Sequence, residues 1–241
     1  MIPHVYVPSK GRPNSSTAAL LDASGVNFSL VVEPSERATY GGKWPVLVLP
    51  ENDKGIAYVR NWILTNHTAG WYWMLDDDIT SFCKTEQARN KKISASEALE
   101  GAGAYFLSDS SIGQASLEYQ QFAWSAKKPV KHNGYCDVAV CINKDRVRML
   151  KYRHEVNLKE DRDFTLQVLA SGMRTARVCR YSFAAPKNGS NTGGLHGEYS
   201  RAGREQAASF LMCQMWPGIC TPVTKTDGRK DVKINWRHFS R

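Results

Sequence analysis

The sequence has no long apolar run, because even the stretch from Trp71 to Leu75 ends after five residues. A helix that crosses a bilayer needs about 20 apolar residues, so no membrane span is expected. The start, Met1 to His4, also lacks the basic and apolar stretches of a secretory signal. These absences predict a soluble, cytoplasmic protein that contacts no membrane.

Paired cysteines are absent as well. The six cysteines are scattered and include no Cys-x-x-Cys pair, which argues against a zinc site or a disulfide framework. Most lie in apolar surroundings, where a buried free thiol is the ordinary state. No internal repeat and no linker divides the 241 residues, a length that suits one α/β domain.

Acidic residues are too few to balance the basic ones. Lys and Arg total 32 against 23 for Asp and Glu, which gives a formal net charge of +9. Such an excess favours a polyanionic partner, because each phosphate contact releases condensed counterions. The diphosphate of a nucleotide needs cations too, so charge leaves contact with nucleic acid open.

What the chain does contain is an alternation of short apolar runs and helical segments. Strands are predicted at residues 4–7, 28–32, 46–49, 71–75, 134–142 and 176–183, and helices from Asn14 or Ser15 to Leu21, through Ile56–Ile63, and at 94–107, 161–171 and 201–215. Repeated strand–helix–strand units predict an α/β fold with a mostly parallel central sheet flanked by helices.

Three aspartates, Asp76, Asp77 and Asp78, follow the apolar run from Trp71 to Leu75 directly. Adjacent carboxylates repel one another unless a cation neutralises them. In open α/β sheets ligands bind at the carboxyl ends of strands, and oxygen ligands favour Mg²⁺ or Mn²⁺. A solvated acidic turn is the alternative interpretation.

Further candidates for ligand contacts lie in the first half of the chain. The loop from Pro8 to Pro13 follows a strand and precedes a helix, so its amides and Arg12 could meet a phosphate or a nucleobase, or the loop could be an ordinary polar turn. Glu33 ends the second strand and could bind a base or ribose, or lie at the surface. Arg60 could reach the nucleotide or remain solvated.

Two candidates lie in the second half. Glu160 and Asp161 open a predicted helix, where acidic residues stabilise the helix dipole, but a carboxylate here could also act as a general base. His196 follows the turn Gly193-Gly194 and could be a third metal ligand beside the aspartates, although a lone loop histidine is more often exposed.

The order of these motifs resembles that of glycosyltransferases of the A-type fold. In that family a D-x-D motif, here Asp76-Asp77-Asp78, holds a divalent metal against the donor diphosphate, and Glu160-Asp161 matches the place of the catalytic base of inverting members. Three stretches, at residues 55–61, 160–167 and 188–195, are similar to the phage-encoded TET-associated glycosyltransferases, which modify 5-hydroxymethylcytosine in DNA.

The resemblance implies a single transferase domain over 1–241, with a nucleotide-sugar-binding half (1–80), an acceptor and catalytic half (81–215) and a basic tail (216–241). It implies a UDP-sugar donor, Mn²⁺ or Mg²⁺, a DNA acceptor and, for a phage protein, the bacterial host cytoplasm. The implied site has Asp161 and Glu160 as catalytic residues, Asp76, Asp78 and His196 at the metal, and Pro8, Ser9, Arg12, Glu33, Arg60, Asp76, Asp77, Gly193 and Gly194 at the donor.

Several alternatives stay open. A related enzyme could act on a glycan or small-molecule acceptor, or could transfer a nucleotidyl group, and a non-enzymatic DNA-binding module would use the acids structurally. In a retaining enzyme Asp161 would position the substrates instead of acting as the base. The basic residues Arg146, Arg148, Lys151 and Arg153, and the tail from Lys225, could contact phosphates or lie solvated.

Overall fold

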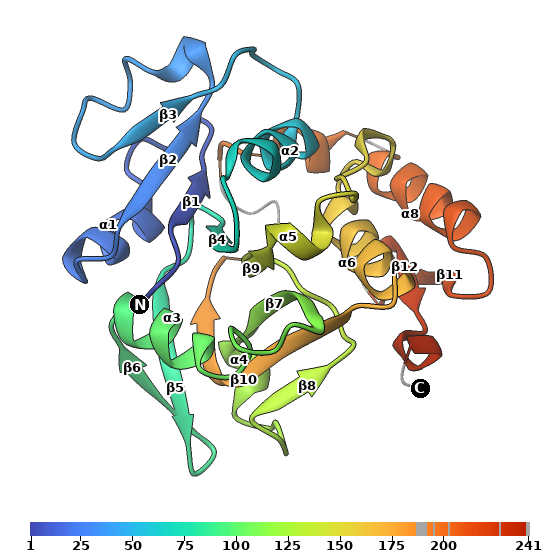
Figure 1. The fold of residues 1–241 in the computed structure, drawn as a ribbon. Helices are drawn as coiled ribbons and strands as arrows, with labels where there is room; N and C mark the ends of the chain where they lie inside the picture. The colour runs from blue at the N-terminus through green and yellow to red at the C-terminus, as the bar shows by residue number, and fades with distance from the viewer. Residues whose placement is uncertain (187–191, 195, 202, 227, 240–241) are drawn as a thin grey trace.

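The fold is built on one large sheet, seen in a computed structural model that describes residues 1–186, 192–194, 196–201, 203–226 and 228–239. Its strand order is β3-β2-β1-β4-β9-β7-β10-β5-β6, and β8 pairs with β10 (Figure 1). The strands are β1 (Val5–Pro8), β2 (Phe28–Val32), β3 (Val46–Val48), β4 (Trp71–Leu75), β5 (Ser81–Glu86), β6 (Arg89–Ile93), β7 (Ile112–Tyr119), β8 (Val130–His132), β9 (Ala139–Asn143) and β10 (Arg174–Ala184).

Most strands of this sheet point the same way. The first four pair in parallel, β7 and β10 run in the same direction as they do, and β9, β5 and β8 run the opposite way. The carboxyl ends of β1, β2, β4, β7 and β10 therefore meet at one edge. The predicted α/β fold is confirmed. Most strands share one direction, but the sheet is mixed, because its pairs are parallel within β3-β2-β1-β4 and between β7 and β10 and antiparallel at β4-β9, β9-β7, β10-β5, β10-β8 and β5-β6.

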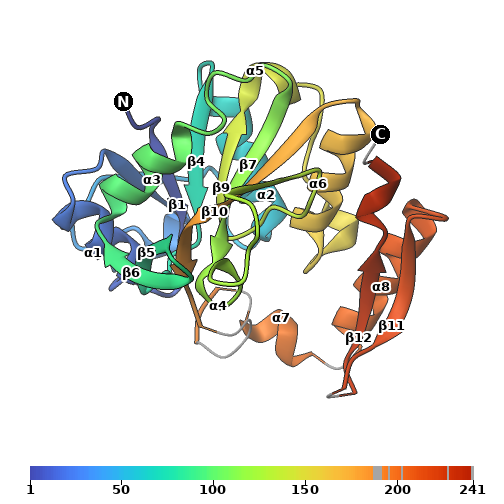
Figure 2. The same cartoon turned by 90° about the horizontal axis from the view of Figure 1, so that it is seen from below.

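Helices cover both faces of the sheet. One face packs against α1 (Ser16–Ala23) and α3 (Ala95–Gly103), the other against α2 (Ile56–Asn66), α5 (Lys144–Val147) and α6 (Glu160–Ala170) (Figure 2). Successive side chains of β4 alternate between these two cores, with Trp73 in one and Tyr72 and Met74 in the other. A strand buried on both faces needs an apolar residue at every position, which is why Trp71–Leu75 is continuous.

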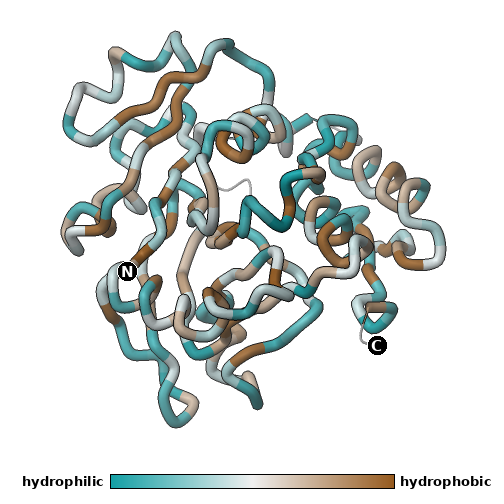
Figure 3. Tube along the Cα trace, viewed as in Figure 1, coloured by the Kyte–Doolittle hydropathy of each residue, from teal (hydrophilic) through white to brown (hydrophobic). Residues whose placement is uncertain are grey.

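Smaller elements connect this framework. They are α4 (Gln120–Ala123), α7 (His196–Ser200) and the single turns η1 (Pro34–Glu36) and η2 (His154–Val156). Figure 3 shows hydrophobic residues along β2 and β3 at the edge of the sheet: β2 is buried along its length, whereas Leu47 and Val48 of β3 are exposed. Helix α1 begins where predicted, because the Ser15 hydroxyl accepts a hydrogen bond from the Ala18 amide at 3.1 Å.

The C-terminal segment forms a separate small layer. Helix α8 (Arg204–Met215) packs on a hairpin of β11 (Cys220–Thr224) and β12 (Lys230–Ile234), followed by the turn η3 (Trp236–Phe239). Val156 and Leu166 share a hydrophobic cluster with Met212 of α8 and with this hairpin, so the layer rests against α6 (Figures 1 and 2).

Some sequence predictions differ from the structure. The strand predicted at 134–142 starts only at Ala139, because residues 134–138 turn through Val138, whose φ is 56°. The predictions did not include β5, β6, β7, β8, β11 and β12. The six cysteines are free thiols, as expected, and within the described ranges no helix has the length and apolarity to cross a membrane.

Candidate active site

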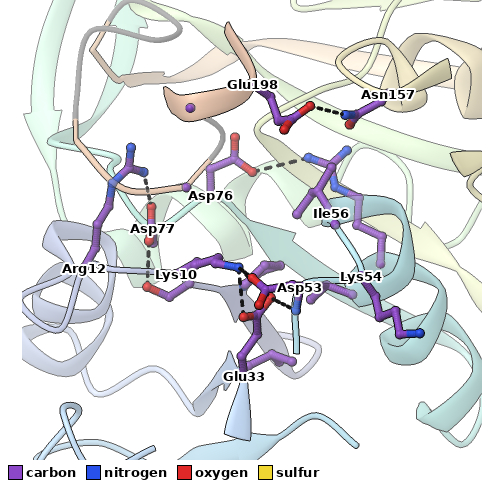
Figure 4. A pocket seen from close by; sticks show the side chains of 18 of the residues that line it. Lys10, Arg12, Glu33, Asp53, Lys54, Ile56, Asp76, Asp77, Asn157 and Glu198 are labelled. Atoms are coloured by element: carbon purple, nitrogen blue, oxygen red, sulfur yellow. Dashed lines mark hydrogen bonds and ion pairs between the residues drawn. The ribbon is translucent and has the colours of Figure 1, made fainter. Parts of the chain in front are cut away.

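A cavity of about 680 Å³ opens at the carboxyl ends of β1, β2 and β4 (Figure 4). It brings together most of the side chains that the sequence singled out. The predicted residues that line it are Pro8, Ser9, Arg12, Glu33, Arg60, Asp76, Asp77, Asp78 and Gly194. The candidate residues Glu160, Asp161, Gly193 and His196 are not among its described lining.

Asp77 is held by hydrogen bonds to both its side chain and its backbone. Its carboxylate accepts hydrogen bonds from Ser9 and from Arg12, both at 2.6 Å, and its backbone carbonyl accepts one from Ser15 at 2.7 Å. Burial raises the pKa of Asp77, although Ser9 and Arg12 act against the shift. Arg12 also reaches Asp78 Oδ2 at 3.2 Å, so one guanidinium bridges two members of the acidic triplet.

Asp76 and Glu160 share one buried arginine. Arg60 Nη2 lies 3.5 Å from Asp76 Oδ1, and Arg60 Nη1 lies 3.3 Å from Glu160 Oε1. Burial raises the pKa of Asp76 to about 8 and that of Glu160 to about 7, in both cases against the opposing effect of Arg60. Arg60 is therefore buried between two carboxyls, and the interpretation of a solvated arginine is wrong.

Asp161 lies half-buried at the start of α6, beside a cluster of polar side chains. The Tyr135 hydroxyl donates to Asp161 Oδ2 at 2.7 Å, and the Tyr119 hydroxyl donates to Asp137 at 2.6 Å. Arg177 completes this cluster, with its Nη2 at 3.2 Å from Asp137 Oδ1. Burial raises the pKa of Asp137, and the negative charge of Asp161 adds to the shift.

The loop between β1 and α1 contributes a cation that the sequence analysis did not single out. Lys10 Nζ lies 2.8 Å from Glu33 Oε2 and 2.6 Å from Asp53 Oδ1, and the Asp53 amide donates to Glu33. Glu33 is buried, so the alternative interpretation of Glu33 as a surface residue is wrong. No local pattern marked Asp53, because its role depends on the approach of Lys10.

The Gly193-Gly194 turn packs against the same loop. The Gly194 amide donates to the Lys10 carbonyl at 2.9 Å, and Arg12 Nε donates to the Thr192 carbonyl at 2.9 Å. Gly193 has φ +85°, and a Cβ there would lie 2.9 Å from the Lys10 carbonyl oxygen, so only glycine fits this approach. Residues 188–191 and 195 of the predicted glycine-rich stretch lie outside the described residues.

His196 begins α7 and is half-buried next to this turn, its amide donating to the Gly193 carbonyl at 3.1 Å. In the part of the chain that the structure describes, no group of three or more His, Cys, Asp or Glu side chains is arranged to hold a metal. The role of His196 as a ligand therefore stays a prediction.

The far wall of the cavity comes from α7 and α8. Glu198, Arg201 and Arg204 line it, and Glu198 accepts a hydrogen bond from Asn157 at 3.1 Å. Arg201 and Arg204 approach Glu198 to 2.8 Å and 3.3 Å. The only signal in the sequence was the i, i+3 spacing of Glu198 and Arg201, which is common on solvated helices.

The C-terminal layer holds the start of α6 in place. Asp231 of β12, 3 % exposed, lies 3.0 Å from Lys159 Nζ, 2.9 Å from Arg162 Nη1 and 2.6 Å from Lys225 Nζ. Burial acts against it, but Lys225, Arg162 and Lys159 hold the pKa of Asp231 well below its usual range. The Trp236 ring stacks 6.1 Å from that of Tyr135.

The other predicted phosphate-contacting residues lie away from the cavity. Arg146, Arg148 and Lys151 are exposed and do not belong to its described lining, while Arg153 pairs with Asp163 at 3.2 Å. Lys225 is engaged by Asp231.

Solved structures with a similar fold include a glucosyl-3-phosphoglycerate synthase and S. aureus TarS. Glucosyl-3-phosphoglycerate synthase from Mycobacterium tuberculosis, in complex with Mg²⁺ and UDP, superposes with a TM-score of 0.59 at 9 % identity, over 97 % of this chain and 87 % of that one. S. aureus TarS 1–349 in complex with UDP-GlcNAc gives 0.59 at 14 % identity, over 90 % and 67 %. A second TarS 1–349 structure gives 0.53 at 15 % identity, over 77 % of this chain and only 60 % of its own.

At these identities the likeness establishes the A-type fold alone, and no curated protein matches the chain. A family model, however, matches residues 3–194, which include the cavity loop, the acidic triplet, Glu160-Asp161 and the Gly193-Gly194 turn. Membership of that family sets aside the non-enzymatic module and the nucleotidyltransferase. The chain is a glycosyltransferase and belongs to the TET-associated glycosyltransferases.

Proposed function

We propose that this enzyme moves a sugar from a UDP-sugar to the hydroxymethyl group of 5-hydroxymethylcytosine in DNA, with the help of a divalent metal. The observation that carries the proposal is a cavity in which an acidic triplet faces several cations. Its volume of about 680 Å³ lies in the range of pockets for ligands of nucleotide-sugar size. The family match and the UDP complexes of the similar structures support the donor.

The donor's two ends would meet different chemistry. The uridine would lie on the loop from Pro8 to Arg12, near Glu33. The diphosphate would lie toward Arg12, Arg201 and Arg204, because guanidinium groups form bidentate hydrogen bonds with phosphate oxygens. Arg201 and Arg204 now share Glu198, so a phosphate would compete with that carboxylate for them.

The acidic triplet suits a hard cation. Asp76 lies at the cavity, and burial raises its pKa. Arg60 alone therefore does not offset the cost of burying the negative charge of Asp76. Asp76 and Asp78 would supply carboxylate oxygens to Mn²⁺ or Mg²⁺, with His196 as a further candidate, and substrate phosphates commonly complete such a shell. When bound, the metal would neutralise charge on the departing diphosphate.

Asp161 would act as the general base. It would take the proton from the hydroxymethyl oxygen as that oxygen bonds to the anomeric carbon and the bond from this carbon to UDP breaks. The hydrogen bond from Tyr135 orients its carboxylate. Glu160 would keep Arg60 beside Asp76, since its Oε1 faces that guanidinium.

Incubation of the protein with Mn²⁺, a panel of UDP-sugars and DNA containing 5-hydroxymethylcytosine tests the proposal. Digestion to nucleosides and mass spectrometry should show 5-hydroxymethyl-2′-deoxycytidine heavier by one sugar, and DNA with unmodified cytosine is the matched control. Release of UDP without a modified nucleoside would refute the DNA acceptor and favour a glycan or small molecule. Equal modification of the DNA without a divalent metal would refute the proposed metal dependence.

A further inference from the structure

A second cleft, of about 480 Å³, lies beside the turn between β5 and β6. Residues of the β5–β6 turn, of the end of α4 and the segment after it, and of β10 line the cleft, together with Tyr105, which follows α3 along the chain. Its lining residues are Thr85, Gln87, Ala88, Tyr105, Ala123, Trp124, Ala126, Lys127, Lys128, Pro129, Cys179 and Arg180. Ala123 and Cys179 are buried, so the cleft has a closed apolar floor.

Aromatic rings stand exposed at this cleft. Trp124 is 55 % exposed and Tyr105 is 40 % exposed, unusually high for such large side chains. The Trp124 indole N–H donates to the Gln121 carbonyl at 2.9 Å. Its only donor is therefore used within the protein, and the ring offers its faces to a partner.

The charge of the cleft has one sign. Among its described lining residues, Lys127, Lys128 and Arg180 are basic and none is an aspartate or glutamate. Glu86 pairs with Arg180 at 3.0 Å, and both lysines are exposed. Cations beside open aromatic rings suit a ligand that combines a flat π-system with a phosphate.

The cleft is connected with the candidate active site through the chain itself. Tyr119, whose hydroxyl bonds Asp137, is the last residue of β7, and α4 begins at the next residue. Phe122 of α4 is exposed, and its ring lies 6.2 Å from that of Tyr119. Trp124 lies two residues after Phe122, so the short segment after Tyr119 leads along the chain from the polar cluster near Asp161 to the cleft.

We propose that this cleft binds an unpaired nucleotide of a DNA strand, with the base stacked on Trp124 and the backbone phosphate beside Lys127 and Lys128. Stacking on an aromatic ring tolerates any base, so the contact would hold the strand without selecting its sequence. As an acceptor subsite the cleft rests on the proposed DNA acceptor, but strand binding can be measured without sugar transfer.

The direct test measures the anisotropy of a labelled oligothymidylate of about 12 nucleotides, within the usual site sizes of roughly 4–16. Trp124→Ala should weaken binding about 5- to 150-fold, the range for loss of one stacked base. Phe210→Ala removes an exposed aromatic ring on α8, outside the cleft, and should bind as the parent protein does.

The charge contribution is tested separately by salt titration. The double variant Lys127→Gln, Lys128→Gln should flatten the slope of log affinity against log salt by about 0.7, since loss of one phosphate contact on a single strand removes about that much. Circular dichroism would establish that each variant is folded. Equal affinity of Trp124→Ala and Phe210→Ala, or no binding of single strands by the parent protein, would overturn the proposal.

Sugar-transfer kinetics distinguish failure of the cleft from failure of the acceptor. If DNA is the acceptor and the cleft holds it, Trp124→Ala raises KM for DNA and leaves KM for the UDP-sugar unchanged. If Trp124→Ala transfers sugar to DNA with an unchanged KM for DNA, the proposed role of the cleft is overturned and the DNA acceptor is upheld. Trp124-dependent strand binding without transfer to DNA upholds strand binding and overturns the acceptor.

Discussion

Replacing Glu160 by Gln tests whether its buried carboxyl is a source of instability. Burial raises the pKa of Glu160 from 4.5 to about 7, although the ion pair with Arg60 opposes the shift. At about 1.4 kcal/mol per pKa unit, ionising this carboxyl costs the folded state about 3 kcal/mol relative to the unfolded chain. The amide keeps the shape of the side chain and removes the titration.

The sign of the effect follows from the raised pKa. The folded state holds this proton more tightly than the unfolded state does, so the contribution to stability is fully present below pH 4.5. It is lost as the pH rises from 4.5 through about 7. The parent protein should therefore lose about 3 kcal/mol that Glu160→Gln does not lose.

Urea unfolding of both proteins, followed by tryptophan fluorescence in chelator, measures this difference. With m-values of roughly 1–3 kcal/mol/M, the gap between their midpoints should change by about 1 M or more from pH 4.5 to pH 7.5. Glu100→Gln, which removes a carboxylate 67 % exposed on α3, is the control for the substitution itself. Stability curves of parent and Glu160→Gln that run parallel across this range would refute the reasoning.

Three further substitutions test other parts of the site. Asp161→Asn should keep UDP binding by calorimetry and lose sugar transfer, because an amide cannot accept the proton; transfer at the parental rate would exclude Asp161 as the base. Asp78→Ala should abolish Mn²⁺-dependent turnover in a UDP-release assay, and near-normal turnover would contradict the metal assignment. Asp231→Asn should lower the free energy of unfolding by about 3–5 kcal/mol, because it weakens the buried ion pairs of Lys159 and Arg162. A loss under about 1 kcal/mol in urea unfolding would show that these ion pairs contribute little.

Strands were predictable where their side chains alone reveal burial. Trp71–Leu75 is apolar at every position and became β4. Strand β7 is also buried along most of its length, yet it contains Gln114 and Ser116, which do not mark a core strand. Thr165 of α6 bonds the Gln114 side chain at 3.2 Å, so a distant helix makes that residue acceptable in the core.

In the candidate site, too, some residues were marked by the local sequence and others were not. The acidic triplet stood out because charge follows an apolar run directly, a contrast visible within one segment. The burial of Arg60 had no local signal, since its partner Glu160 lies far along the chain. Lys10 and Asp53 likewise acquire a role only when two loops meet.

The family match covers residues 3–194, but the contacts that hold the start of α6 extend beyond this range. The match ends at residue 194, while Asp231 neutralises Lys159 and Arg162 on either side of Glu160-Asp161. A graft of residues 3–194 onto another C-terminal segment would leave these cations without a carboxylate that they share. Relatives that differ in this segment should therefore carry compensating changes at the start of α6. Substitutions in the two regions are expected to occur together.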